Sequence, residues 1–178
     1  MTATQESPSP RVELIPANRE QQPVLANLLQ LYMHDFGEFF PLDLDPSGRF
    51  DYPHLPLYWS EPGRFPFLIH VDGRLAGLVF VKRGSGIVHG EEIWDMAEFF
   101  IVRAYRRQGI GVKVAHQVWA KFPGWWEVRV MESNRAAVGF WLRAITAFVG
   151  APVEPVTNEK DGMRWLVFAF ESEPLING

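Results

Sequence analysis

A short turn with two arginines and two glycines carries the residue types that best bind an anion. It lies in the stretch 98–111, which reads Glu-Phe-Phe-Ile-Val-Arg-Ala-Tyr-Arg-Arg-Gln-Gly-Ile-Gly and predicts an apolar strand, a basic turn and the start of a helix. The first N–H groups of a helix have no intrahelical partner, and the helix dipole adds about half a positive charge there. Gly109 and Gly111 put no Cβ in the way of a ligand, and Arg106 and Arg107 add permanent positive charge. We therefore expect this turn to bind an anionic ligand such as a diphosphate.

Two well-known glycine loops do not fit this turn. The dinucleotide fingerprint Gly-x-Gly-x-x-Gly needs a third glycine where the chain has Val114, and the Gly-Lys-Ser/Thr end of the P-loop is absent. The pattern that remains is Arg106-x-x-Gly109-x-Gly111. A pattern this short also fits an ordinary turn between a strand and a helix.

The residues after the turn form a second pattern. Apolar residues at 110, 114, 115, 118, 119 and 122 recur at helical spacing, and Pro123-Gly124 ends that helix. Residues 125–131 then predict a short strand, and Ser133-Asn134 can cap a further helix. One side of this second helix is apolar and carries Ala137, Phe140, Trp141 and Ala144.

Together these patterns resemble those of the GCN5-related N-acetyltransferase (GNAT) superfamily, and the resemblance covers residues 93–148. The glycine turn is similar to the Arg/Gln-x-x-Gly-x-Gly/Ala loop with which that family binds the pyrophosphate of acetyl-CoA. Asn134, Ala137 and Phe140 fit its second motif, Asn-x-x-Ala-x-x-Phe-Tyr, but Trp141 stands in place of the Tyr. The chain is most similar to a bacterial branch of predicted acetyltransferases that shares an Ala-Glu-Phe-Phe strand and a Phe-Pro-Gly-x-Trp-Glu turn.

The resemblance implies a fold and a cosubstrate. The implied fold is a single-domain α/β structure with a mixed, mostly antiparallel sheet of six to seven strands flanked by helices, and its central strands splay apart to admit the pantetheine arm. The implied cosubstrate is acetyl-CoA, without a metal. The residues expected to bind it, several of them through their backbone, are Phe99, Ile101, Arg103, Arg106, Arg107, Gln108, Gly109, Ile110, Gly111, Val112, Asn134 and Phe140.

Three carboxylates are candidates for the general base that deprotonates an attacking amine. Asp95 lies eleven residues before Arg106, which is the spacing of the catalytic Glu in the histone-acetylating members of the family. Glu98 lies in the same predicted strand on the opposite face. Glu127 lies in the facing strand, although the position aligned with the Glu of some ribosomal-protein acetyltransferases is Arg129. A carboxylate on an apolar strand can accept a proton near neutral pH because burial raises its pKa, and the alternative for each is a solvated strand-end carboxylate. Glu98 and Asp95 rank together ahead of Glu127.

Two residues that the chain lacks limit the possible mechanism: a tyrosine after Tyr105, which could act as general acid, and a cysteine, which could carry the acyl group. Trp141 cannot protonate a thiolate and no tyrosine follows Tyr105, so Ser133, a water molecule or no dedicated acid remain as alternatives. A thiolate can leave unassisted because its pKa is far below that of an alkoxide. The chain has no cysteine, which excludes disulfides and a cysteine-acyl intermediate, so we expect direct transfer within a ternary complex.

Acidic residues after the first predicted helix are candidates for the acceptor site. His34, Asp35 and Glu38, together with aspartates of the following loop, would suit a cationic amine such as a polyamine or an aminoglycoside. Trp59 in the same loop is a further candidate contact. The alternative is that these loop acids face solvent. The five histidines show no metal-ligand spacing, and the sequence does not name the acceptor.

The elements that must position these residues follow a simple order, in which Asp72-Gly73 signals a hairpin. The sequence predicts a first strand, a helix, a short helix in the long loop, three strands, the helix after the glycine turn, a strand, a helix and a last hairpin. The ranges outside the two motifs are 11–15, 17 to about 36, 55–59, 65–71, 75–82, 93–102, 148–156 and 163–170.

Length and composition set the broad class. The chain has 178 residues, of which 47% are hydrophobic and 14% aromatic, and a formal net charge of −4. These values predict one packed domain at 11–172, a disordered leader at 1–10 and a tail at 173–178. The charge argues against a nucleic-acid partner, and no apolar stretch is long enough to span a membrane. The N-terminus lacks the features of a secretory signal, which predicts a cytoplasmic location.

The leading hypothesis is an acyltransferase that moves an acetyl group from acetyl-CoA directly to an amine of a small molecule or peptide. Its partners are then acetyl-CoA and an amine acceptor. Two alternatives stay open: a non-catalytic acyl-CoA-binding or sensing module, which the missing Tyr favours, and a phosphate-binding domain that uses a nucleotide. An exposed edge strand would also permit a homodimer.

Overall fold

The computed structural model describes residues 9–90 and 92–173, which fold around one seven-stranded sheet. The strand order is β1-β2-β3-β4-β5-β7-β6, and neighbouring strands are antiparallel except for β4 and β5. The strands are β1 (Val12–Pro16), β2 (Arg64–Val71), β3 (Arg74–Ser85), β4 (Glu92–Ile101), β5 (Gly124–Met131), β6 (Val156–Lys160) and β7 (Met163–Ser172). The α-helices are α1 (Gln22–Phe36), α2 (Leu57–Ser60), α3 (Ile110–Lys121) and α4 (Arg135–Val149). The predicted mixed, mostly antiparallel α/β fold is confirmed.

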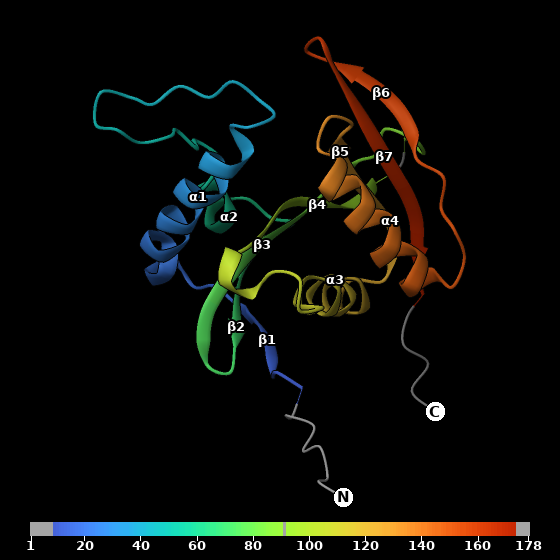
Figure 1. Ribbon diagram of the computed structural model, residues 1–178, viewed down its shortest axis with the longest axis horizontal. Helices are drawn as coiled ribbons and strands as arrows, with labels where there is room; N and C mark the ends of the chain where they lie inside the picture. The colour runs from blue at the N-terminus through green and yellow to red at the C-terminus, as the bar shows by residue number, and fades with distance from the viewer. Residues whose placement is uncertain (1–8, 91, 174–178) are drawn as a thin grey trace, which may run out of the picture.

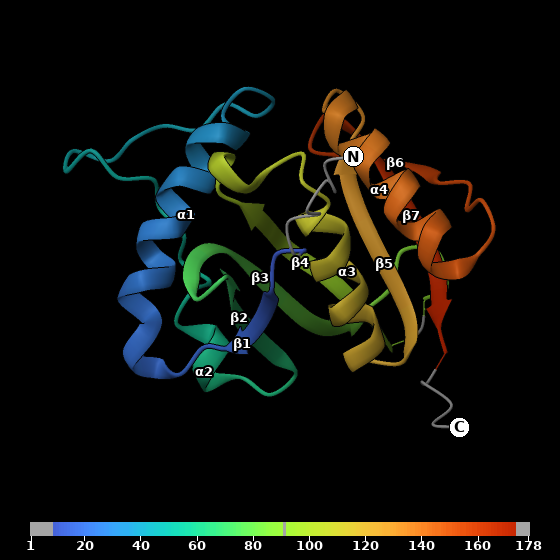
Figure 2. The same cartoon turned by 60° about the horizontal axis from the view of Figure 1, so that its bottom comes forward.

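The helices cover both faces of this sheet (Figures 1 and 2). α1 and α2 lie on one face, and α3 and α4 lie on the other. Alternation along β3 supplies both cores, because Val79 and Val81 join the apolar cluster on the α3 side while Leu78 and Phe80 join the cluster on the α1 side. The central strands of the sheet are therefore buried on both faces.

Two element boundaries differ from the sequence prediction. α1 begins at Gln22 and not near residue 17, because Asn18 caps a short 3₁₀ turn and exchanges hydrogen bonds of 3.0 and 3.1 Å with Gln21. The predicted strand at 148–156 was wrong. Phe148 belongs to the apolar stripe of α4, which runs on until Gly150 ends it in the left-handed conformation at φ 81°, so β6 starts only at Val156.

A β-bulge in β4 changes which side chains share a face. Phe80 of β3 pairs with Glu98, but the next residue, Val81, pairs with Met96, so Ala97 is an extra residue in β4. Directly paired residues point the same way, and Asp95 pairs with Lys82 on the same face as Phe80. Asp95 and Glu98 therefore point to one face, and the expectation of opposite faces was wrong because the period of two is broken between them.

The described residues also bear on the ends of the chain and on membrane spanning. The predicted leader lies outside these residues except for Ser9 and Pro10, and the predicted tail lies outside them except for Glu173. None of the helices found in ranges 9–90 and 92–173 has the length and apolar character needed to cross a bilayer.

Candidate active site

The two parallel strands of the sheet separate shortly after they meet. In the described residues β4 and β5 are in register only at Trp94 with Trp126 and at Asp95 with Glu127, and the strands then diverge (Figure 1). The predicted splay of the central strands is confirmed. Main-chain N–H and C=O groups on the diverging edges are free to pair with an extended ligand. A cavity of about 440 Å³ lies here, bounded by both strands, by α1 and the loop after it, by α4, and by the β6–β7 hairpin.

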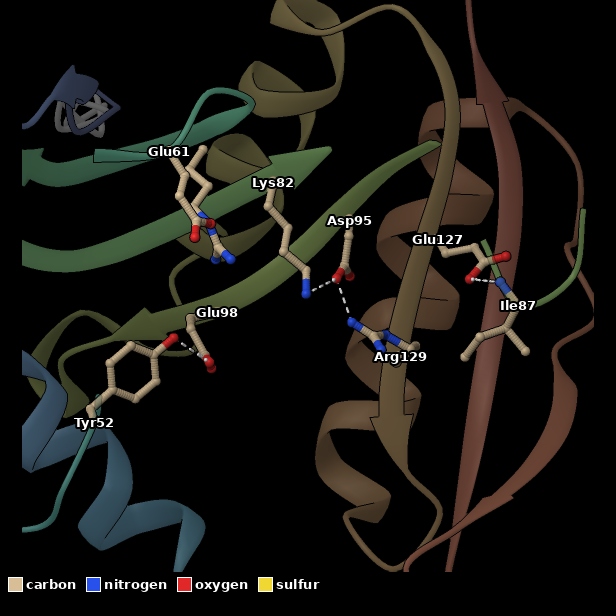
Figure 3. A network of polar contacts seen from close by, with 9 residues as sticks. Tyr52, Glu61, Lys82, Ile87, Asp95, Glu98, Glu127 and Arg129 are labelled. Carbon is tan, nitrogen blue, oxygen red and sulfur yellow. Dashed lines mark hydrogen bonds and ion pairs between the residues drawn. The ribbon is translucent and has the colours of Figure 1, made fainter. Parts of the chain in front are cut away.

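Glu98 is the half-buried carboxylate of this cavity. It lines the cavity together with Tyr32 and Tyr52, and the Tyr52 hydroxyl donates a hydrogen bond of 2.8 Å to Glu98 Oε1 (Figure 3). Burial raises the pKa of Glu98 above its ordinary value, and the two tyrosine hydroxyls offset part of that rise by stabilising the anion. A raised pKa makes this carboxylate a better proton acceptor than an ordinary exposed glutamate.

Asp95 is buried, but its charge is already engaged. Lys82 Nζ lies 3.5 Å from Asp95 Oδ2, and Arg129 on β5 donates a hydrogen bond to the same oxygen (Figure 3). Only 5% of Asp95 is exposed, and it does not line the cavity, whereas Arg129 does. Asp95 therefore joins β3, β4 and β5 through its two cations and orients the Arg129 guanidinium.

Glu127 is buried at a different place and holds a loop. Its two carboxylate oxygens accept hydrogen bonds from the backbone N–H groups of Ile87, at 2.9 Å, and Val88, at 2.7 Å. Figure 3 shows Glu127 on β5 turned towards Ile87 and away from Glu98. Ile87 lines the cavity and Glu127 does not, so Glu127 positions one wall of the cavity from behind.

The glycine turn begins α3 as predicted, but its two glycines serve different purposes. Gly109 caps the helix in the left-handed conformation at φ 76°, and a Cβ added there would meet nothing within 4 Å. A Cβ on Gly111 would lie 3.0 Å from Phe140 Cε2, so this glycine allows α3 to pack closely against α4. The two sequence patterns are thus joined by direct contact between Gly111 and Phe140.

Arg106 is turned towards the protein. Its Nε donates a hydrogen bond of 2.7 Å to the carbonyl of Ile101, and its terminal nitrogen lies 2.6 Å from Asp35 Oδ2. Arg103 holds the other oxygen of Asp35 at 2.5 Å. Burial alone would raise the pKa of Asp35, but the hydrogen bonds and charges of Arg106 and Arg103 outweigh it and hold that pKa below its ordinary value. Asp35 therefore ties the end of α1 to the segment that follows β4.

The remaining residues expected at the turn divide between surface and core. Arg107 is exposed with a positive φ of 61°, and Gln108 is exposed with its side-chain amide donating to the carbonyl of Ala104 at 2.8 Å. Ile110 is 1% exposed and belongs to the core, where Val112 packs against it in part. The N–H groups at the start of α3 have no partner within the helix, and such groups are suited to bind an anion.

The cavity floor on the α4 side is aromatic. Phe99 packs against Phe140 and Trp141, with ring centroids 5.7 and 5.0 Å away. Trp141 is 7% exposed and lines the cavity where the related motif has a tyrosine. Asn134 also lines the cavity, and its side chain caps α4 by accepting a hydrogen bond of 3.1 Å from the N–H of Ala137.

The residues expected to bind the acceptor are not brought together. His34 and Glu38 are exposed, and the Trp59 indole donates a hydrogen bond of 3.0 Å to the carbonyl of Ala17. Of the residues described by the structure, neither these three nor Asp35 lines the cavity. The aspartates of the following loop are exposed, and Asp45 accepts hydrogen bonds from its own turn.

Sequence reasoning missed the residues that take their place. One wall consists of Tyr32, Phe36, Phe40 and Leu42 at the end of α1 and in the loop after it. The recurrence of an aromatic residue every fourth position from Tyr32 was a signal that could have identified this wall. Tyr52 had no comparable signal, because only the folded loop places it beside Glu98. Across 9–90 and 92–173, no group of three or more His, Asp or Glu side chains could hold a metal ion.

Comparison with known proteins places this geometry in context. The model of the acetyltransferase (GNAT) family matches residues 25–145. A search of curated protein sequences found no match.

Solved structures with the same fold are numerous but distant in sequence. An acetyltransferase from Thermus thermophilus aligns with a TM-score of 0.66 and 15% identity over 90% of this chain and 96% of the other. Spermidine N-acetyltransferase from Vibrio cholerae, in complex with CoA and spermine, aligns with a TM-score of 0.59 and 12% identity over 90% and 95%. Naa50 from Arabidopsis thaliana, in complex with the bisubstrate analogue CoA-Ac-MVNAL, aligns with a TM-score of 0.58 and 15% identity over 90% and 98%. At these identities the likeness concerns the fold alone.

Proposed function

This chain belongs to the acetyltransferase (GNAT) family, and from that premise we propose that it transfers an acetyl group from acetyl-CoA directly to an amine. The observation that carries the proposal is the position of Glu98. It is a half-buried carboxylate with a raised pKa, and it lies in the cavity that opens where β4 and β5 diverge. An amine acetyltransferase needs a proton acceptor at such a place, because an amine attacks only after it has lost the proton of its ammonium form.

The cosubstrate binds along the diverging edges of β4 and β5, with its pyrophosphate at the start of α3. The helix N-terminus from Gln108 to Val112 offers N–H groups to the phosphates, and Arg107 adds an exposed positive charge at that turn. Arg106 and Arg103 support the site indirectly, since both hold Asp35. The pantetheine arm pairs with the free edge of β4 near Phe99 and Ile101, as a peptide strand does.

Glu98 accepts the proton of the amine, and the neutral nitrogen then attacks the thioester carbonyl. Tyr52 orients the carboxylate and stabilises its anionic form through its 2.8 Å hydrogen bond. A backbone N–H late in β4 polarises the carbonyl. Trp141 supplies no proton to the departing thiolate, so the thiolate leaves without a protein acid and takes a proton from water.

Two measurements test this function. Calorimetry should detect acetyl-CoA binding below millimolar concentration, and a thiol-release assay with a broad panel of amines should detect free CoA. A protein that binds no acetyl-CoA at these concentrations would refute the proposal.

A second candidate is a non-catalytic module that binds or senses acyl-CoA. The observation that favours it is Trp141, which occupies the position of the usual tyrosine and is packed into the aromatic floor of the cavity. Such a module would bind acetyl-CoA in the calorimeter and release no thiol with any amine. The same two measurements therefore separate the two functions.

A further inference from the structure

The side of the cavity that faces α1 is mostly apolar. Phe36, Phe40 and Leu42 form one wall, and Trp165 comes from β7 on the other side. The rings of Tyr32, Phe36 and Phe40 follow one another with centroids 5.9 and 6.1 Å apart. A wall of this kind receives an apolar or aromatic body and excludes water from it.

The charges that line the cavity are mixed in sign. Besides Glu98 they belong to Arg129 and to Lys160 and Asp161, and the latter two are exposed at the β6–β7 turn. Glu98 is therefore the one carboxylate of the described lining that is partly withdrawn from solvent. A polyamine, with its further ammonium groups, would bring positive charge towards Arg129 and find no second sheltered carboxylate among the described lining residues.

Arg129 has hydrogen-bond donors to spare. One terminal nitrogen donates to Asp95 Oδ2, its side chain is 34% exposed, and it lines the cavity. A planar guanidinium carries several N–H donors, so the bond to Asp95 orients the group and leaves other donors for a ligand. Lys82 shares the same Asp95 carboxylate, so two cations face one anion and the cluster keeps one positive charge in excess.

We propose that the acceptor is a zwitterion, an α-amino acid or close analogue with an apolar, aromatic-sized side chain, whose ammonium group binds Glu98 and whose carboxylate binds Arg129. The proposal rests on the acetyltransferase function inferred above and narrows its substrate class. Glu98 and Arg129 project from the two diverging strands into the same cavity (Figure 3), so they can address two groups of opposite charge on one small molecule. The wall from α1 receives the side chain.

The chemical step balances with acetyl-CoA as the only co-reactant. The ammonium group gives one proton to Glu98, and its nitrogen forms a bond to the acetyl carbonyl carbon. The C–S bond breaks, the electron pair leaves with the CoA thiolate, and the thiolate takes a proton from water. The second amine proton passes to solvent, Glu98 then releases its own proton to solvent, and the products are an N-acetyl amino acid and CoA.

Acceptors that differ in one group test the proposal on the unmodified protein. Thiol release is measured at saturating acetyl-CoA with phenylalanine, with phenethylamine, which lacks the carboxylate, with glycine, which lacks the apolar body, and with spermidine. We expect kcat/KM for phenylalanine to exceed that for phenethylamine by about ten- to a hundredfold, the range of a hydrogen bond to a charged group, and to exceed those for glycine and spermidine as well. Release that is equal or faster with phenethylamine or spermidine overturns the proposal and leaves the acetyltransferase function standing. If none of the amines causes thiol release, both the zwitterion proposal and the acetyltransferase function are overturned.

A matched pair of variants tests the role of Arg129. In Arg129→Gln the ratio of kcat/KM for phenylalanine to that for phenethylamine should fall towards one. Arg143→Gln, which removes an exposed arginine of α4, should keep the wild-type ratio. An unchanged ratio in Arg129→Gln overturns the assignment of the carboxylate site.

A second variant covers the case in which Arg129→Gln fails to fold because Asp95 loses a partner. Phe36→Ala removes part of the apolar wall and should reduce the ratio of the kcat/KM values for phenylalanine and glycine by about tenfold or more, since one methylene group in an apolar pocket is worth at least about tenfold. An unchanged ratio would overturn the assignment of the wall.

Discussion

The Tyr52 hydroxyl and the Glu98 carboxylate are 46 positions apart in the sequence and meet at 2.8 Å in the cavity between β4 and β5. The contact needs both the loop between α1 and α2 and the bulge at Ala97, which turns Glu98 to the face that the loop covers. Burial by itself would favour a protonated Glu98, and the hydroxyl counteracts this by stabilising the anion. The pair therefore gives the site a carboxylate whose pKa is raised by burial and partly lowered again by the hydroxyl donor.

Glu98→Gln should lower kcat by about a hundredfold or more, because general-base catalysis contributes on the order of 10²–10⁴. The amide keeps the size of the side chain and can still accept the Tyr52 hydrogen bond, but it cannot take a proton. Steady-state thiol release measures the effect, and Glu154→Gln, at an exposed position, is the control. If Glu98→Gln turned over at the wild-type rate, Glu98 would have no part in the chemistry.

The same substitution should stabilise the protein as pH rises. The pKa of Glu98 is raised above its ordinary 4.5, so the folded state binds its proton more tightly than the unfolded state does. Stability from this group is then complete below pH 4.5 and is lost as pH rises through the raised pKa. The Tm of Glu98→Gln relative to wild type should increase over that window and level off above it. A Tm difference that does not change with pH would contradict the raised pKa.

Tyr52→Phe should move the acid limb of the kcat/KM profile to higher pH. The variant removes the donor that stabilises the Glu98 anion, so the carboxylate becomes harder to ionise. The measurement is the pH profile of thiol release, with Tyr105→Phe as a control on the other side of β4. A limb at the wild-type pH would mean that the hydroxyl does not act on Glu98.

Gly111→Ala and Gly109→Ala should destabilise the protein for different reasons. The first places a Cβ 3.0 Å from Phe140, an overpacking that costs about 1–3 kcal/mol. The second forces alanine into φ 76°, at a cost of about 1–2 kcal/mol, with open space around the new methyl group. Urea unfolding measures both, and Phe140→Leu should rescue only the Gly111 variant. Rescue of both, or of neither, would contradict the packing explanation.

Asp35→Asn should lower the free energy of unfolding by about 1 kcal/mol near neutral pH, the scale of partly exposed ion pairs. The pKa of Asp35 is lowered from 3.8, so its contribution is present above pH 3.8 and lost as pH falls through the lowered value. The stabilities of variant and wild type should therefore converge in acid. High salt should also reduce the difference at neutral pH, and insensitivity to both salt and pH would exclude the ion pairs with Arg103 and Arg106 as its cause.

The sequence predicted the frame of the site more reliably than its contents. The glycine turn, the order of the central elements and the mixed sheet follow from local patterns, such as apolar periodicity and helix caps, and the structure confirms them. The prediction that Asp95 and Glu98 lie on opposite faces of the strand was wrong, because no residue type in the sequence indicates the β-bulge at Ala97. The predicted start of the last hairpin was too early, because an apolar stretch at the end of a helix resembles a strand in sequence.

The sequence by itself determined the local structure, which depends on residues that are close together in the chain. Each of these local features spans only a few residues: the turn from Arg106 to Gly111, the cap at Asn134 and the aromatic repeat from Tyr32. Only the tertiary structure decided which partner each carboxylate has. In the folded chain Asp35 pairs with Arg106 and Asp95 pairs with Arg129. Glu127 accepts hydrogen bonds from a loop, and Glu98 lines the cavity. The physical reason is that a carboxylate becomes structural or basic according to the partners and the burial that distant segments supply, and these do not appear in the spacing of residues along one strand.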